Sequence, residues 1–131
     1  MSLPQFLNFS AAPTHVAPFS HAVEADGWVF VTGQMPTDPN DDDKPLADGV
    51  EAQTRRVMDN LLIVLGEINL GLENVVNCRV YLTEFKRDYG MMNDTYKAYF
   101  AAGRLPSRTC IGVTALARDA LVEIDMVVRR P

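Results

Sequence analysis

Three residues near the end of the chain could do chemistry, although they lie in segments that otherwise have the pattern of apolar strands. Arg108 and Cys110 belong to the run 106–113, and Glu123 belongs to the run 121–128. A charged group inside a strand is costly unless a counter-ion or ligand compensates it. The planar fork of an arginine can bind a carboxylate through two hydrogen bonds, and a half-buried glutamate has a raised pKa that suits acid or base catalysis. These residue types suggest a site for a small carboxylate.

Each of these residues also has a structural interpretation, and the spacing alone does not decide between the two. Arg108 could form an ion pair with an acidic residue of another subunit, and Glu123 could be one half of a buried ion pair. Cysteines in the position of Cys110 are more often small buried hydrophobes than nucleophiles, and no histidine lies near it in the sequence. We therefore expect no covalent catalysis.

The first half of the chain predicts a hairpin followed by a helix. The runs 20–26 and 28–32 meet at the Asp-Gly pair 26–27, which favours a tight turn. Residues 48–67 have helical spacing of apolar side chains, with Asp48 as the expected N-cap. The apolar stripe consists of Val50, Val57, Leu61, Val64, Leu65 and Ile68.

The second half predicts a strand, a helix and two further strands. Residues 75–83 alternate and are rich in β-branched types, whereas 84–102 return to helical spacing with a stripe of aromatic and methionine residues. Such a stripe is more often core than a cofactor site. The final strands are expected at 108–116 and 121–128, and a short strand at 6–9 could precede the hairpin.

The resulting order, β-β-α-β-α-β-β, predicts an α+β fold with two helices on one face of a mixed sheet. One layer of helices leaves the other face of the sheet uncovered, so that face must be polar or covered by another subunit. Apolar residues on both strand faces favour the second arrangement. We therefore expect a homo-oligomer.

Alternation along the strands sorts the polar residues onto one face. Arg108 and Cys110 share a face of one strand, and Glu123 and Asp125 share a face of the other. We assign these polar faces to the side away from the helices. A simple hairpin between the two strands would separate Arg108 from Glu123 by roughly 20 Å at ~3.3 Å per residue. Either the strands are not neighbours, or a site using both residues draws one of them from another subunit.

Length and composition indicate one domain spanning residues 1–131, of an ordinary globular kind. The chain is 47% hydrophobic and 22% charged, and its net charge of −5 argues against nucleic acid as the main partner. Apolar runs are far shorter than the ~20 residues needed to cross a bilayer. Residues 1–6 have neither the basic flank nor the apolar stretch of a signal peptide, so we expect a cytoplasmic protein with no membrane partner.

The potential metal ligands do not form a recognisable site. Cys78 and Cys110 both lie in expected strands, where a reducing compartment keeps them as thiols. His15 and His21 have no cysteine or histidine cluster near them. The run Asp41–Asp43 lacks the glycine and distal glutamate of a calcium loop and is typical of a solvated turn. We expect neither a metal nor a cofactor.

Four short motifs together carry a family resemblance, and they occur in consistent order between residues 13 and 130. They resemble the RidA family, also called the YjgF family, whose members are also described as endoribonuclease L-PSP or translation initiation inhibitor. The motifs are Thr32-Gly33-Gln34-Met35-Pro36, Met92-Asn93-Asp94-Thr95-Tyr96, Pro106-Ser107-Arg108-Thr109-Cys110 and Val122-Glu123-Ile124-Asp125.

This resemblance implies a chorismate-mutase-like fold assembled as a homotrimer, with clefts between subunits. It also implies an enamine and imine deaminase that hydrolyses 2-aminoacrylate and 2-iminopropanoate to a 2-keto acid and ammonia without a cofactor. At matching positions, Arg108 would hold the substrate carboxylate, and Glu123 would position or activate the attacking water. The remaining residues of the implied pocket are Thr32, Gly33, Asn93 and Cys110, with Phe19 at its wall.

Two departures from the family pattern bear on the substrate. Pro18-Phe19 stands where deaminases of the family have Pro-Tyr, so a phenolic hydroxyl is missing from the cleft. Thr32 replaces the commoner serine, which keeps the hydroxyl and adds a methyl group. Two other functions therefore remain as alternatives. One is a translation inhibitor or endoribonuclease, which the acidic composition disfavours, and the other is a non-catalytic carboxylate-binding module, which Phe19 favours.

Overall fold

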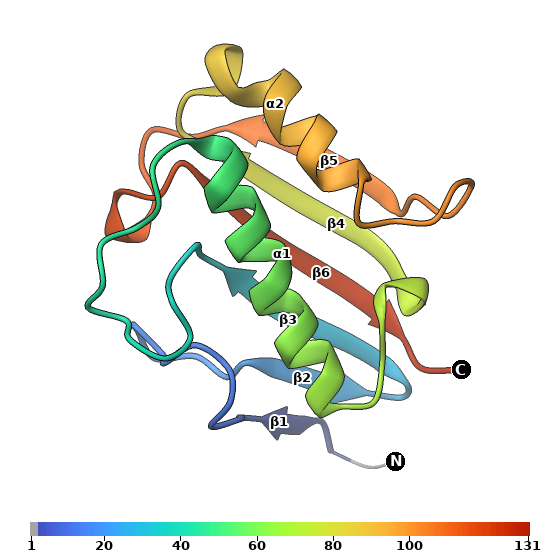
Figure 1. Cartoon of the computed structure of the whole chain (residues 1–131). Helices are drawn as coiled ribbons and strands as arrows, with labels where there is room; N and C mark the ends of the chain where they lie inside the picture. The colour runs from blue at the N-terminus through green and yellow to red at the C-terminus, as the bar shows by residue number, and fades with distance from the viewer. Residues whose placement is uncertain (1–2) are drawn as a thin grey trace.

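The computed structural model describes residues 3–131 (Figure 1). Residues 1 and 2, which belong to the segment inspected for a signal peptide, lie outside the described residues. The elements in chain order are β1 (Gln5–Leu7), β2 (Ala22–Ala25), β3 (Trp28–Gln34), α1 (Val50–Glu67), η1 (Leu72–Asn74), β4 (Val75–Leu82), α2 (Phe85–Lys97), β5 (Ser107–Gly112), η2 (Ala117–Asp119) and β6 (Val122–Arg129).

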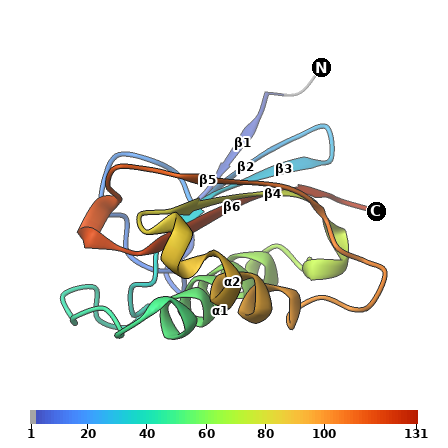
Figure 2. The same ribbon diagram turned by 90° about the horizontal axis from the view of Figure 1, so that it is seen from above.

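The six strands form one mixed sheet in the order β1-β2-β3-β6-β4-β5. Strands β4 and β5 are parallel, and every other neighbouring pair is antiparallel. Helices α1 and α2 both lie on the same side of the sheet, as the view along it shows (Figure 2). The predicted α+β arrangement is confirmed, and β1 occupies the place of the optional first strand.

The predicted hairpin is confirmed as β2 and β3. Asp26 and Gly27 at its turn have φ values of 52° and 81°, the left-handed conformations that a two-residue type I′ turn requires. At the other end of β3 the pairing with β6 shifts register between Val31 and Gln34. This irregularity lies at Thr32 and Gly33, two of the residues implied for the pocket.

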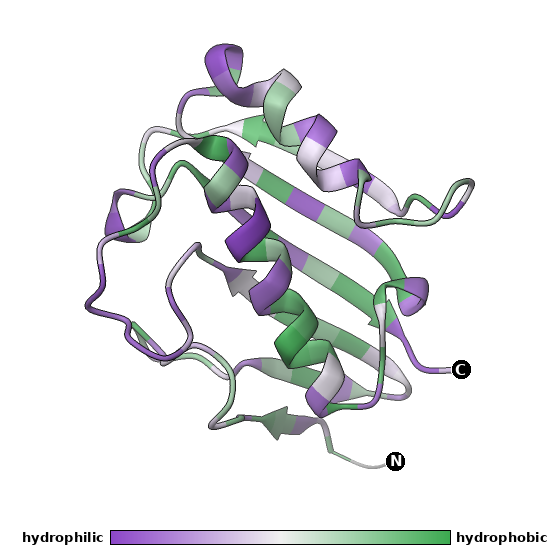
Figure 3. Ribbon diagram, viewed as in Figure 1, coloured by the Kyte–Doolittle hydropathy of each residue, from purple (hydrophilic) through white to green (hydrophobic). Residues whose placement is uncertain are grey.

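The core fills the space between the two helices and the sheet. Figure 3 shows apolar and polar residues alternating along β4, as expected of a strand with one buried face. The predicted apolar stripe of α1 is buried there. The largest fully buried side chains include Met58, Leu61, Leu65, Leu82, Met92, Ile124 and Met126.

The ends of both helices differ from the sequence prediction. Gly49, not Asp48, is the N-cap of α1, and it has a φ of 86° that favours glycine. Helix α2 ends at Lys97 rather than at residue 102. The chain tightens there into i→i−3 hydrogen bonds, because the N–H groups of Tyr99 and Phe100 donate to carbonyls three residues back.

The last two strands are not neighbours, the first of the two alternatives that the sequence left open, because β4 lies between β5 and β6. The α2 crossover places β5 parallel to β4 on one side. The segment 113–121 then passes the end of β4, where the N–H of Val113 donates to the carbonyl of Leu82 and that of Thr83 to the carbonyl of Leu121. The chain therefore enters β6 on the other side of β4.

The assignment of polar faces is correct for β6 and wrong for β5. Ile124 and Met126 are buried against the helices, so Glu123 and Asp125 lie on the open face of the sheet. On β5, Arg108 pairs with Cys78 and Cys110 with Val80, and both β4 residues are fully buried on the helix side. Arg108 and Cys110 therefore face the helices, because aromatic residues of α2 cover this edge of the sheet.

The open face carries large apolar residues that no element of the described chain covers. Trp28, Phe30 and Ile111 are 42%, 51% and 47% exposed. The strand register places Phe6, Val23, Phe30 and Val127 in one row across four neighbouring strands. No helix in residues 3–131 is long and apolar enough to cross a bilayer.

Candidate active site

Arg108 lies at the edge of the sheet, where its guanidinium is held by aromatic rings. The guanidinium carbon is 5.0 Å from the ring centroid of Tyr96 and 6.0 Å from that of Tyr89, both on α2. Within residues 3–131 this guanidinium forms no ion pair and no hydrogen bond. Cation–π contact restrains the side chain without using its N–H donors. Those donors remain available to a carboxylate.

Two further candidates, Asn93 and Cys110, lie near Arg108. Asn93 shares a face of α2 with Tyr89 and Tyr96, and its Oδ1 is buried without a hydrogen-bond partner in the described chain. Cys110 lies two residues from Arg108 on the same strand face, and burial raises the pKa of its thiol. The raised pKa disfavours a thiolate nucleophile, in agreement with the expectation of no covalent catalysis. We call these five residues the Arg108 group.

Glu123 lies on the open face between β4 and β3. Its register partner on β4 is Tyr81. On the β3 side, a β-carbon at Gly33 would overlap the Glu123 carboxylate and lie 3.1 Å from its carboxyl carbon. Burial, and to a lesser extent the charge of Asp125, raises the pKa of Glu123. A glycine at residue 33 therefore leaves room for a carboxyl group with a raised pKa.

A hydrogen-bonded cluster beside Glu123 was not predicted from the sequence. The Nε of Arg79 donates to both carboxylate oxygens of Asp125, at 3.0 and 3.1 Å, and its Nη2 lies 2.8 Å from Oδ2. The hydroxyl of Tyr81 donates to the same Oδ2 at 3.3 Å. The alternation of Arg79 with Tyr81 and of Glu123 with Asp125 could have indicated it, once β4 and β6 were known to be neighbours.

Phe19 lies in the loop before β2, and Thr32 lies in β3 directly before Gly33. The hydroxyl of Thr32 donates to the carbonyl of Ser20 at 2.5 Å, so it is already engaged. Phe19 and Gly33 line the same small cavity of about 20 Å³. Without a phenolic hydroxyl, Phe19 presents only its ring to this space. We call Phe19, Thr32, Gly33 and Glu123 the Glu123 group.

The loop before β2 is organised around His21, another residue that the sequence analysis did not single out. His21 is buried, and its Nδ1 accepts from the N–H of Phe9 at 2.9 Å, while Nε2 donates to the carbonyl of Pro13 at 2.8 Å. The ring of His15 stacks on it at a centroid distance of 4.0 Å. Burial lowers the pKa of His21, so the neutral ring that both hydrogen bonds need is favoured.

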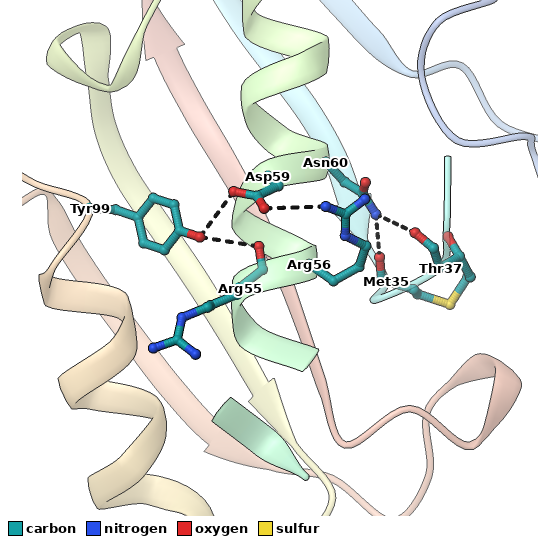
Figure 4. A network of polar contacts seen from close by, with 7 residues as sticks. All are labelled: Met35, Thr37, Arg55, Arg56, Asp59, Asn60 and Tyr99. Atoms are coloured by element: carbon teal, nitrogen blue, oxygen red, sulfur yellow. Dashed lines mark hydrogen bonds and ion pairs between the residues drawn. The ribbon is translucent and has the colours of Figure 1, made fainter. Parts of the chain in front are cut away.

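A polar network around α1 fixes the chain just after Gly33 (Figure 4). The buried Asn60 donates from Nδ2 to the carbonyls of Met35 and Thr37, at 3.0 and 2.8 Å. The residue before it, Asp59, accepts a hydrogen bond from the hydroxyl of Tyr99 at 3.0 Å. These contacts connect the end of β3 and the segment after α2 to α1.

The acidic run Asp41–Asp43 is the one carboxylate cluster with metal-ligand spacing that the described residues contain. Its oxygens lie within 4.8 Å of one another. Arg118 contacts Asp42 at 3.3 Å, which compensates part of the charge. The cluster lies in an exposed turn, as the sequence suggested.

The Arg108 group and the Glu123 group cannot bind one small molecule within a single chain. Arg108 pairs with Cys78 of β4, and Cys78 pairs with Met126 of β6. Met126 lies three residues after Glu123 on β6. An odd offset places the two side chains on opposite faces of the sheet. They are also separated by two strand spacings, about 10 Å. A site that uses both residues needs a second copy of the chain.

Comparisons with known proteins agree with this architecture. Residues 9–130 match the family model of endoribonuclease L-PSP. A RutC family protein of Synechocystis is 36% identical over 97% of both chains. The mouse protein named 2-iminobutanoate/2-iminopropanoate deaminase is 32% identical over 92% of this chain and 87% of its own. The solved structure of YyfA, a Rid family protein of Yersinia pestis, has a TM-score of 0.89 and 28% identity, covering 97% and 99% of the two chains. The chain therefore belongs to the endoribonuclease L-PSP family, the RidA/YjgF family that its four sequence motifs resemble.

Proposed function

We propose that this protein hydrolyses enamines and imines of small 2-keto acids, at a site formed between two copies of the chain. The observation that carries the proposal is the pair formed by Arg108 and Glu123. Arg108 is an uncompensated guanidinium held by tyrosines, and Glu123 is a half-buried carboxyl group with a raised pKa. The name of the mouse relative supports this substrate class.

The geometry favours a ring of subunits, and we propose the homotrimer that the family resemblance implies. The Arg108 group lies on the helix side of β5, whereas the Glu123 group lies by the open face and β3. A contact that joins these two different surfaces is heterologous, and such contacts form a ring when their rotation closes. The apolar row that contains Phe30 would be buried in the same assembly.

In the proposed reaction, Arg108 binds the substrate carboxylate and places the imine carbon near Glu123 of a neighbouring copy. Ionised Glu123 takes a proton from water as the water oxygen bonds to the imine carbon, and the C=N electron pair moves to nitrogen. Protonated Glu123 then gives its proton to the amine. The C–N bond breaks, the hydroxyl oxygen forms the carbonyl as its proton passes to ionised Glu123, and a 2-keto acid and ammonia leave. Glu123 then gives this proton to ammonia or water and is ionised again.

The side chains described above suffice for this chemistry. A protonated imine carbon is already electrophilic, so orientation and one proton-transfer group can carry the reaction. A group that alternates between base and acid works best with a pKa close to the reaction pH. The raised pKa of Glu123 moves that carboxyl group in this direction.

The direct test is hydrolysis of 2-aminoacrylate produced in the assay by a PLP-dependent serine dehydratase. We expect the wild-type protein to lower the amount of imine trapped by semicarbazide. Arg108→Ala should lower kcat/KM by about 10²-fold or more, because the substrate loses its anchor. Arg104→Ala is the matched control, since the exposed Arg104 side chain donates, within residues 3–131, only to the carbonyl of Glu73. Wild-type rates equal to those without the protein would refute the proposal.

Phe19 favours a second candidate function, which is carboxylate binding without turnover. The missing hydroxyl removes one polar contact from the space beside Gly33. Thermal stabilisation by pyruvate in a protein that leaves the imine unchanged would support this function. RNA cleavage, which the family description suggests, has less support, because the net charge is −5.

A further inference from the structure

We propose that Asp125 is a positioning residue that controls the protonation of Glu123, and that Arg79 fixes the Asp125 carboxylate and offsets part of its charge. The inference rests on the proposed function, because it assigns how the proton-transfer group of that site is regulated. It concerns residues of β4 and β6 that lie on the open face of the sheet.

The Asp125 carboxylate is fixed rather than free to rotate. Arg79 and Tyr81 together direct donors at both of its oxygens, and the side chain is only 14% exposed. Two-point binding of a carboxylate by an arginine fixes geometry as well as charge. Asp125 therefore presents a negative charge at a defined place on this face.

On that face of β6 the residues two positions from Asp125 are Glu123 and Val127, and Glu123 is the ionisable one. Residues two apart on a strand point the same way and lie about 6.6 Å apart. Arg79 pairs with Asp125 in the ladder, and Tyr81 pairs with Glu123. The four side chains thus form two adjacent cross-strand pairs, one with an arginine and one without.

The groups that face Glu123 from the neighbouring strands leave it without a cation. On the β4 side the titratable neighbour is Tyr81, and on the β3 side Gly33 has no side chain. Gln34, the next residue of β3, is buried. No ion pair of Glu123 occurs among residues 3–131. Within one chain, Asp125 is therefore the charged group that acts on Glu123.

Two carboxylates on one face cannot both ionise without repulsion, so the environment decides which of them holds a proton. Asp125 has Arg79 as its partner. Glu123 has none, and it becomes the group that takes up and releases the proton. Burial and the charge of Asp125 both raise the pKa of Glu123. This agrees with Glu123 being the carboxyl group that takes up and releases the proton.

Two substitutions should move the titration of Glu123 in opposite directions. Asp125→Asn removes the nearby negative charge but keeps an oxygen acceptor for Arg79 and Tyr81, so Glu123 should titrate at lower pH. Arg79→Gln removes the compensating cation, so the Asp125 charge acts undiminished and Glu123 should titrate at higher pH. If Asp125 and Arg79 only stabilised the sheet, their substitution would not shift the titration of Glu123 in opposite directions.

The experiment is a carbon-13 NMR titration of protein labelled at glutamate side chains, with the Glu123 signal identified by its loss in Glu123→Gln. The acidic limb of kcat/KM against pH is measured on the same variants and should move with the NMR midpoint. Arg129→Gln is the matched control, because Arg129 lies six residues from Glu123 on the same strand and contacts Trp28 instead. Its midpoint should equal that of the wild type.

Shifts of opposite sign in the two variants support the inference, whereas unchanged midpoints or shifts of the same sign overturn it. The Arg79 side chain is 63% exposed, so we expect Arg79→Gln to fold. If Asp125→Asn does not fold, a shift of the Glu123 midpoint to higher pH in Arg79→Gln supports the inference, and an unchanged or lower midpoint overturns it. The NMR titration needs no turnover. A protein that shows the opposite shifts but no imine hydrolysis would refute the proposed function and leave the inference intact.

Discussion

The Glu123 carboxyl group links stability to function at the scale of a single residue. Its pKa in the folded chain is raised above the ordinary value of 4.5, with burial as the main cause. The folded state therefore binds this proton more tightly than the unfolded state does. In the window from pH 4.5 up to the raised pKa, the free energy of unfolding contributed by this group falls as the pH rises.

Glu123→Gln should remove this loss of stability together with the activity. We expect the variant to equal the wild type in urea unfolding below pH 4.5 and to be more stable than the wild type at pH 8, because the amide is never ionised. Its kcat/KM should fall by about 10² to 10⁴.

Glu67→Gln, at an exposed position near the end of α1, is the control for the change of charge. It should show the same stability relative to the wild type at both pH values. A stability difference for Glu123→Gln that does not vary with pH would contradict the account of Glu123.

At the scale of elements, the close approach of β3 to β6 makes Gly33 a sensitive position. Gly33→Ala should force the Glu123 carboxylate to move, because the added β-carbon overlaps it. The flexible end of a glutamate can shift without unfolding the sheet. We expect kcat/KM to fall about tenfold or more, with little change in the urea midpoint.

Gly66→Ala is the matched control for this substitution. A β-carbon there meets nothing within 4 Å, and Gly66 lies inside α1. Alanine should stabilise the helix by up to about 1 kcal/mol and leave kcat/KM unchanged. Equal activity losses in the two variants would contradict the role given to Gly33.

The elements also show which features local sequence can and cannot predict. The Asp26-Gly27 turn and the apolar stripe of α1 follow from residue preferences, and both were predicted correctly. The position of β4 between β5 and β6 depends on the α2 crossover, a long-range pairing that has no local signal. The polarity of Arg108 misled the assignment of the β5 face, because tyrosines far along the chain supply its cover.

At the scale of the whole molecule, we propose that one chain carries two incomplete halves of a site. The four motifs located both halves in the sequence, but alternation within a strand says nothing about the other strands or about a second copy. The odd register offset places Arg108 and Glu123 on opposite faces of the sheet. A site that contains both residues therefore requires a second copy of the chain. The exposed row that includes Phe30 provides a surface for that assembly.

Complementation between two inactive variants tests the shared site most directly. Arg108→Ala and Glu123→Gln are unfolded together, mixed in equal amounts, refolded and assayed for imine hydrolysis. If each site takes Arg108 from one copy and Glu123 from the next, random mixing in a ring should restore about a quarter of the wild-type activity. Adding Phe30→Asp to both variants should abolish the recovery by preventing assembly. A mixture no more active than the separate variants, in oligomers shown to be mixed, would contradict a site shared between subunits.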